Sequence, residues 1–316
     1  MAPLLARNTI LQAGVESTYG SSPGGGNIKT IRVREIALTP VVQEQVDRQL
    51  IRGYAGQFEQ VLANQRTEIT ITCELANSGT AGTAPRWAQL LRACAMTETS
   101  AGSGARFTYA PTSSITTQTS VYLRCYIDGQ EHLIAGCRGT FDLSYEVGQI
   151  PTITFSFTGR FDEPTTTGAS GVTYATEMIA QPVRYGTTNG FEFWGSTALS
   201  CKSWSYSHNN TVIFDENIGN NRLVRIVDRK PTGSLTIEES SSFDTTNAVT
   251  CGDTGTNTLT HQGIGAAAGN KIVVSCPQSR ALPHSLSVEN EIYYATIPFN
   301  AEPSSAGNDE FKLELY

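Results

Sequence analysis

Apolar and polar residues alternate with a period of two along much of this chain, and that pattern constrains its fold more than any other feature. Such alternation puts every second side chain on one face of an extended strand, so it predicts strands with one buried face. Thr, Val, Ile and aromatic residues fill these segments, and those residue types favour strands. The alternating segments are 67–75, 121–127, 140–145, 152–157, 191–194, 202–206, 235–238, 271–276 and 311–315.

Two short turn signals suggest how these strands connect. Asp128-Gly129 and Asn189-Gly190 both tolerate a positive φ, which tight hairpins require. We therefore expect largely antiparallel sheets. A turn at Asp128-Gly129 would set Cys125 opposite His132, and Cys137 would then lie too far along the strand to form a disulfide with Cys125.

One segment, residues 84–97, has helical spacing instead. Thr83 is a candidate cap and Pro85 suits a first helical turn. The apolar residues recur at i, i+3, i+4 and i+7, which predicts one buried helix face packed on a sheet. The residues on that face are Trp87, Leu90, Leu91 and Cys94.

Composition excludes several function classes. Charged residues make up 16% of the 316 residues, against about 25% in an ordinary soluble domain, and the net charge is −7. A chain of this charge offers no positive field for DNA, RNA or anionic lipid. We expect no signal peptide and no membrane span, since no apolar stretch has the required length. The seven cysteines are dispersed without a CxxC pair, which indicates small buried residues.

No residue pattern points to catalysis, so we predict no catalytic residue, no cofactor and no metal site. The four histidines stand apart from one another and from Cys or carboxylate partners at ligand spacing. The chain also lacks the Gly-x-Ser-x-Gly motif of hydrolases. Carboxylates on several strands leave a glycosidase pair open as an alternative, because such pairs are rarely adjacent in sequence.

The sequence divides into two related halves, and its length of 316 residues agrees with two domains of about 150 residues each. The stretch 154–164 resembles 294–303, and 45–52 resembles 219–225, with an alternating strand following each of the latter two. This order favours a tandem duplication. We expect an N-terminal arm at 1–28, a first domain at 29–165, a linker of Thr, Gly and Ser at 166–181, and a second domain at 182–316.

Residues 41–66 form the most unusual segment. It is expected to be a loop, yet it is too long and too apolar for a passive one. Arg, aromatic and aliphatic side chains together are typical of interfaces, and 217–230 has the same character. The alternative is that this segment folds back on its own domain. The candidate interface residues are Arg48, Leu50, Ile51, Arg52, Tyr54, Phe58, Val61, Leu62, Arg222, Leu223, Arg225 and Ile226.

The N-terminal residues 1–10 with 16–20, the stretch 74–94 and the stretch 128–140 resemble the major tail tube proteins of long, non-contractile-tailed bacteriophages (siphophages). The most specific parts are 78–85 and 90–94, and the likeness is looser beyond residue 165. This resemblance implies a mainly β fold of tandem tail-tube-type β-sandwich or barrel domains, the first with one flanking α-helix. It also implies rings of protomers, here trimers with pseudo-sixfold symmetry, stacked around a lumen through which DNA passes.

The same resemblance implies that the partners are further copies of this chain, the tape measure protein, the tail terminator and the tail-tip proteins. DNA would pass without specific binding, no membrane would be involved, and the protein would assemble in the host cytoplasm and reside in the virion tail. The loop 41–66, the arm 1–28 and the C-terminal tail are its candidates for stacking. A carbohydrate-binding β-sandwich or adhesin module is the main alternative, and it predicts exposed Trp side chains.

Overall fold

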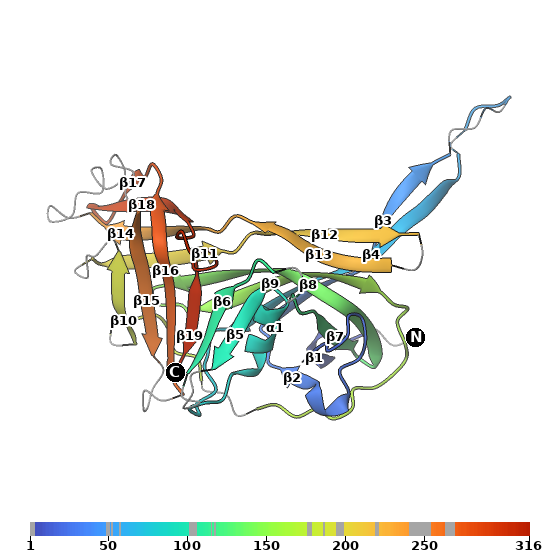
Figure 1. Cartoon of the computed structure of the whole chain (residues 1–316), viewed down its shortest axis with the longest axis horizontal. Helices are drawn as coiled ribbons and strands as arrows, with labels where there is room; N and C mark the ends of the chain where they lie inside the picture. Colours follow the sequence, from blue (N-terminus) through green and yellow to red (C-terminus); the bar gives the residue numbers. More distant parts are fainter. Residues whose placement is uncertain are drawn as a thin grey trace.

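The computed structural model confirms a mainly β, largely antiparallel protein (Figure 1). Every pairing between two named strands is antiparallel, and a single isolated bridge between Val147 and Val183 is parallel in the part of the chain described. No helix among the described residues is long and apolar enough to cross a membrane. The structure describes residues 4–48, 51, 53–56, 58–100, 106–114, 116, 118–175, 179–185, 187–193, 199–218, 221–239, 254–262 and 269–316.

The first half of the chain, up to residue 165, contains strands β1 to β9 and the described helices. Three short 3-10 helices, η1 (Ala6–Asn8), η2 (Gly25–Asn27) and η3 (Arg86–Ala88), accompany one α-helix, α1 (Gln89–Arg92). The strands are β1 (Thr9–Val15), β2 (Lys29–Ile31), β3 (Glu35–Asp47), β4 (Gln60–Glu74), β5 (Met96–Ser100), β6 (Phe107–Pro111), β7 (Val121–Ile127), β8 (Gln130–Glu146) and β9 (Thr152–Phe161).

The second half, from residue 182, contains the remaining strands. They are β10 (Thr188–Phe193), β11 (Cys201–Ser207), β12 (Asn210–Asn217), β13 (Asn221–Arg229), β14 (Thr232–Glu238), β15 (Thr254–Gln262), β16 (Lys271–Ala281), β17 (Ser285–Glu289), β18 (Ile292–Ala301) and β19 (Lys312–Leu315). The alternating segments predicted from sequence lie on these strands, except for three residues. Leu75 directly follows β4, Phe311 directly precedes β19, and Trp194 is outside the described residues.

One continuous run of antiparallel strands extends through both halves, in the order β3, β4, β9, β8, β11, β14, β18, β17. The halves join in this run where β8 pairs with β11. A second run, β5, β6, β19, β16, β15, β10, also crosses between the halves, where β6 pairs with β19. Strand pairing at two places therefore ties together the halves that sequence divides at residues 166–181.

The core lies on one side of the long run. Its inward residues pack with the second run, with α1 and with β1 and β7 in one buried cluster. The aromatic side chains at the β8–β11 junction meet there. Phe141 of β8 stacks on His208 with ring centroids 4.8 Å apart, and Tyr206 stacks on Phe311 at 4.3 Å. The junction between the halves is therefore part of the core.

His208 is fully buried in this aromatic cluster, and its Nδ1 lies 2.9 Å from the Tyr206 hydroxyl. Its pKa is lowered to about 3, because burial removes water from the charged imidazolium and Arg229 lies nearby. The unfolded chain would take up a proton there below about pH 6.5, whereas the folded chain would not. Stability contributed by neutral His208 is thus present above pH 6.5 and lost as the pH falls toward 3.

We therefore expect His208→Gln to flatten the pH dependence of stability. Between pH 6 and pH 4, the unfolding free energy of the unaltered protein should fall by about 1.4 kcal/mol per pH unit more than that of the variant. Urea unfolding followed by Trp fluorescence at several pH values measures both slopes. The two slopes should agree above pH 7, where His208 is neutral in either state, and equal slopes at pH 4–6 would contradict the assignment.

The two predicted turns differ in outcome. Asp128 (φ 47°) and Gly129 (φ 89°) form the turn between β7 and β8, and Cys125 lies opposite His132 as expected. Cys125 and Cys137 are both free. Asn189-Gly190 is not a turn, because both residues lie inside β10, where a register shift interrupts the pairing with β15.

The predicted helix at 84–97 is wrong in length. Helical structure begins at Arg86 and ends at Arg92, and Thr83 does not cap it, since the residue before the first helical turn is Pro85. Ala95 takes a positive φ of 58°, after which Met96 begins β5. The chain leaves the helix because Met96 must pair with Pro111 on β6. The buried apolar face, Trp87, Leu90, Leu91 and Cys94, is as predicted.

The expected N-terminal arm is also different. Within residues 1–28, strand β1 pairs with β7 along its whole length and with β2 on its other side. Leu11 and Ala13 are completely buried there. In this structure the segment is a strand of the first half, and the expectation of an arm that swings out about Pro23–Gly26 is corrected.

Candidate assembly surfaces

Residues 41–47 and 60–66 are strands and not the loop expected from sequence. Strands β3 and β4 continue beyond the body of the first half and pair as a hairpin as far as Asp47 and Gln60. Their register shifts between Thr39 and Val42 and again between Val42 and Glu44. Bulges of this kind bend a strand. The hairpin leaves the body and extends into solvent (Figure 1).

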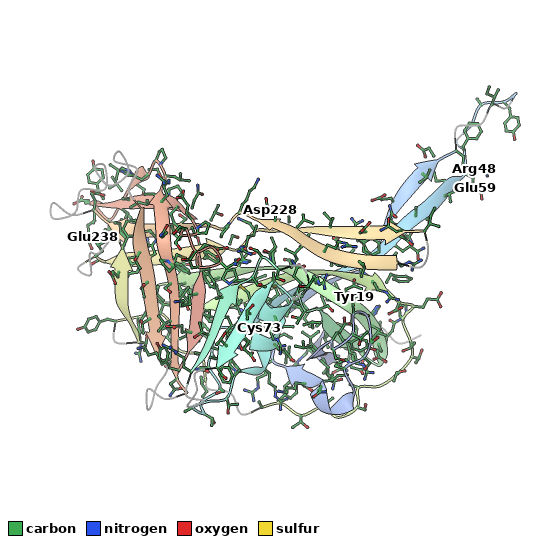
Figure 2. All side chains as sticks on the ribbon, viewed as in Figure 1. Tyr19, Arg48, Glu59, Cys73, Asp228 and Glu238 are labelled. Carbon is green, nitrogen blue, oxygen red and sulfur yellow. The ribbon has the colours of Figure 1, made fainter. Side chains whose placement is uncertain are left out.

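The distal part of this hairpin carries apolar side chains with little covering them. Val46 and Val61 lie opposite each other and are exposed, as are Leu62 and Tyr54, while Ile51 is entirely exposed. Figure 2 shows Arg48 and Glu59 out on the same hairpin, where they form an exposed ion pair of 3.5 Å. Phe58 is half-buried, and Leu50 and Arg52 lie outside the described residues. The structure therefore gathers the described candidates of 48–62 on one projecting element.

Strands β12 and β13 form a second hairpin, which emerges from β11 and β14 and lies across β8 and β9 of the first half (Figure 1). Side chains of the first half bind its backbone. Arg138 donates from Nη1 to the Val224 carbonyl at 2.7 Å, and the Val224 N–H donates to the Tyr19 hydroxyl at 2.7 Å. Gln118 donates to the Ile226 carbonyl at 3.0 Å. This hairpin is therefore held inside the protomer.

The predicted candidates on the second hairpin have correspondingly different environments. Arg222 and Arg225 pair with Glu216 (2.8 Å) and Asp215 (3.2 Å) on the neighbouring strand. Leu223 is half-buried, and Ile226 is buried against the first half. Ile226 is thus a contact between the halves and not an exposed interface residue. The exposed large apolar side chains among the described residues of this hairpin are Ile213, Val227 and, at its distal end, the fully exposed Ile218.

Sequence reasoning missed a third surface, the hairpin of β17 and β18. Leu286 and Val288 of β17 are 55% and 59% exposed, and Tyr293 lies opposite Val288. The turn between the strands uses Asn290 (φ 51°) and Glu291 (φ 67°). That turn lacks the glycine that marks most tight hairpins, so the available signal was the alternation in Ser285–Glu289 alone.

The long run of strands ends in two open edges. Among the described residues, β3 pairs only with β4 and β17 pairs only with β18, so each has one side without a strand partner. Open edges of this kind readily add another strand. The face of the run that points away from the core carries mainly hydroxyl and carboxylate groups, together with the cationic side chains of Arg66, Arg160 and Lys202. Thr72 and Thr154 hydroxyls are 3.1 Å apart on it, as are Thr236 and Thr296 at 3.2 Å.

A carbohydrate-binding surface and a metal site find little support among the described residues. Trp87 and Trp204 are each 2% exposed, which counts against a sugar-binding surface built on them, and Trp194 lies outside the described residues. Within the described residues no cluster of three or more His, Cys, Asp or Glu side chains is arranged to hold a metal ion.

Comparison with known proteins adds an independent finding. The family model described as phage tail tube protein matches residues 6–307, which is nearly the whole chain. A search of the curated proteins returned no match. The matched range includes both halves and all three surfaces described above.

Proposed function

This chain belongs to the phage tail tube protein family, and from that premise we propose that its rings are trimers with pseudo-sixfold symmetry, stacked around a lumen for DNA in a long, non-contractile tail. Membership of the family makes the protein a structural subunit of the virion tail. The observation that carries the proposal is the continuous run of strands with two open edges, shared by two halves of similar topology. Three such chains would present six similar units around the ring.

The two halves have corresponding strand arrangements, which supports the pseudo-sixfold ring. In the first half, β4 is the returning strand of the long hairpin and pairs with β9 near the end of that half. In the second half, β14 follows the β12–β13 hairpin and pairs with β18. The duplication inferred from sequence, with domains at 29–165 and 182–316, is the simplest origin of this correspondence.

We assign the outward face of the long run to the lumen. Its hydroxyl groups are small and neutral, and the exposed carboxylates Glu74, Glu146 and Glu238 lie on strands of both halves. Carboxylates repel the phosphates of DNA, whereas each Lys or Arg contact with phosphate would hold the DNA back. A wall of this chemistry suits a conduit through which DNA slides.

We assign the β3–β4 hairpin to contacts between successive rings. It is the element that projects farthest from the body, and its exposed apolar residues need a partner surface (Figure 1). The tape measure protein would occupy the lumen before DNA, and the terminator and tail-tip proteins would meet the two ends of the tube. These partners and assembly in the host cytoplasm follow from the family and belong to the proposal.

Negative-stain electron microscopy of the purified protein at high concentration tests this function. We expect hollow rings or tubes, with threefold modulation in averaged end views. Strict sixfold averages with one chain per unit would contradict the trimer. Dispersed particles that bind a glycan array would favour the carbohydrate-binding alternative.

A further inference from the structure

We propose that β17 of one copy pairs with β3 of the next, in the same register that β8 and β11 have inside the chain. The occupant of both open edges is thus a second copy of this protein. The inference rests on the proposed ring and adds to it the strands, the register and the side chains that close it. The argument comes from an internal comparison of the two halves.

The strands of the two halves can be matched row by row from the residues that pair across them. In the first half, Asp142 of β8 lies opposite Thr154 of β9, and Thr154 lies opposite Thr72 of β4, which pairs with Glu35 of β3. In the second half, the corresponding row runs from β17 to β18, β14 and β11. Its members are Ser285, Thr296, Thr236 and Ser203.

The contact between the two threonine hydroxyls occurs at the same place in both rows, at 3.1 Å and 3.2 Å. By this comparison β17 corresponds to the end of β8, and β3 corresponds to β11. The sequence agrees, since Asp142-Leu-Ser-Tyr-Glu146 and Ser285-Leu-Ser-Val-Glu289 are identical at three of five positions.

The corresponding strands β8 and β17 differ in how far their apolar side chains are buried. Leu143 and Tyr145 of β8 are each 1% exposed, because β11 lies beside them and Tyr145 meets Trp204 with ring centroids 5.8 Å apart. The equivalent side chains on β17, Leu286 and Val288, are more than half exposed. A strand in the position of β11 would cover them.

Strand β3 has the side chains to do so. At the internal junction Tyr145 lies opposite Trp204, and Leu143 opposite Tyr206. The residues of β3 that correspond to Trp204 and Tyr206 are Ile36 and Leu38, both half-buried on the edge of the core. Val288 would therefore lie opposite Ile36 of the next copy, and Leu286 opposite its Leu38.

The same register specifies the polar face. Ser144 lies opposite Ser205 at the internal junction, so Ser287 would lie opposite Ala37 of the next copy. Glu289 would lie opposite Glu35, with Arg34 beside both. Arg34 precedes Glu35 as Lys202 precedes Ser203. Lys202 forms an ion pair with Glu289 of its own chain and also interacts electrostatically with Glu146. A cation thus accompanies the carboxylates at both junctions.

Cysteine cross-linking tests the register. Residues directly opposite in an antiparallel pair have Cα atoms about 4.5–5.5 Å apart, which a disulfide can span. The variant Ala37→Cys with Ser287→Cys, oxidised in preparations whose rings are visible by microscopy, should run as covalent dimers and trimers on non-reducing denaturing gels. The ladder should stop at the trimer, because a closed ring has no further partner.

The matched control is Ala37→Cys with Ser285→Cys, in which the partner is displaced by two residues to about 7–8 Å, beyond disulfide reach. Each single-cysteine variant controls for the native cysteines. Rings that cross-link only through Ser287→Cys support the inference. Rings that do not cross-link, or that cross-link only through Ser285→Cys, overturn the register and leave the tube function intact. Absence of rings in every preparation overturns the function and the inference together.

Discussion

The double variant Leu286→Asp with Val288→Asp should fold as a protomer and fail to form rings. Both side chains are already exposed in the protomer, so replacing them costs little folding free energy. In the proposed junction they are buried, and each aliphatic side chain contributes about 1.5–3 kcal/mol when it is removed from water. Because a little over half of each side chain is still exposed, losing both should weaken each junction by about 20- to 300-fold, before the cost of burying two carboxylates is added.

Size-exclusion chromatography with light scattering measures the assembly state, and thermal unfolding measures folding. Val172→Asp is the matched control, because Val172 is also exposed but lies on neither open edge. That control should assemble normally. Rings of normal yield from the double variant would show that β17 is not a junction strand.

A variant with residues 46–61 replaced by Asn-Gly should form rings that do not stack into tubes. Gln45 and Leu62 lie opposite each other, so a two-residue turn can join them without changing the register of the remaining hairpin. The replacement removes Val46, Ile51, Tyr54 and Val61 from the projecting end. Losing even three such side chains from a buried contact corresponds to more than about 1,000-fold in affinity.

The readout is tube length by negative-stain microscopy, with ring yield as the internal reference. Val172→Asp is again the control, because Val172 is exposed but lies outside the hairpin, and its tubes should keep their length. Tubes of normal length from the shortened hairpin would refute its stacking role. Loss of rings as well as tubes would indicate that the hairpin is needed to close the ring.

Local patterns were sufficient for the strands and for one turn. The segments 121–127 and 152–157 alternate strictly, and a one-residue slip would turn their apolar residues to solvent, so the pattern determines which face is buried. Asp128-Gly129 accepts a positive φ at both positions at little cost, and the hairpin register followed from it. The resemblance of 78–85 and 90–94 to tail tube proteins directed the interpretation toward a structural role.

Only the tertiary structure decided the rest. The helix stops at Arg92 because β5 must pair with β6, a contact that helical spacing does not encode. Residues 41–66 were expected to be a loop because charged and apolar residues are mixed there without strict alternation. In the structure, strands β3 and β4 continue from the packed sheet into solvent and form a hairpin there. Ile226 resembled an exposed anchor in sequence and is instead buried against the other half.

Sequence by itself determined which residues are extended and which faces are apolar, because alternation acts on neighbours along one strand. It could not determine which strand lies beside which. Three identical residues in 142–146 and 285–289 have different environments. Leu143 is covered by β11, whereas no strand among the described residues covers Leu286, which is 55% exposed. Pairing between strands distant in the chain sets that difference, and such pairing depends on the closure of the whole sheet.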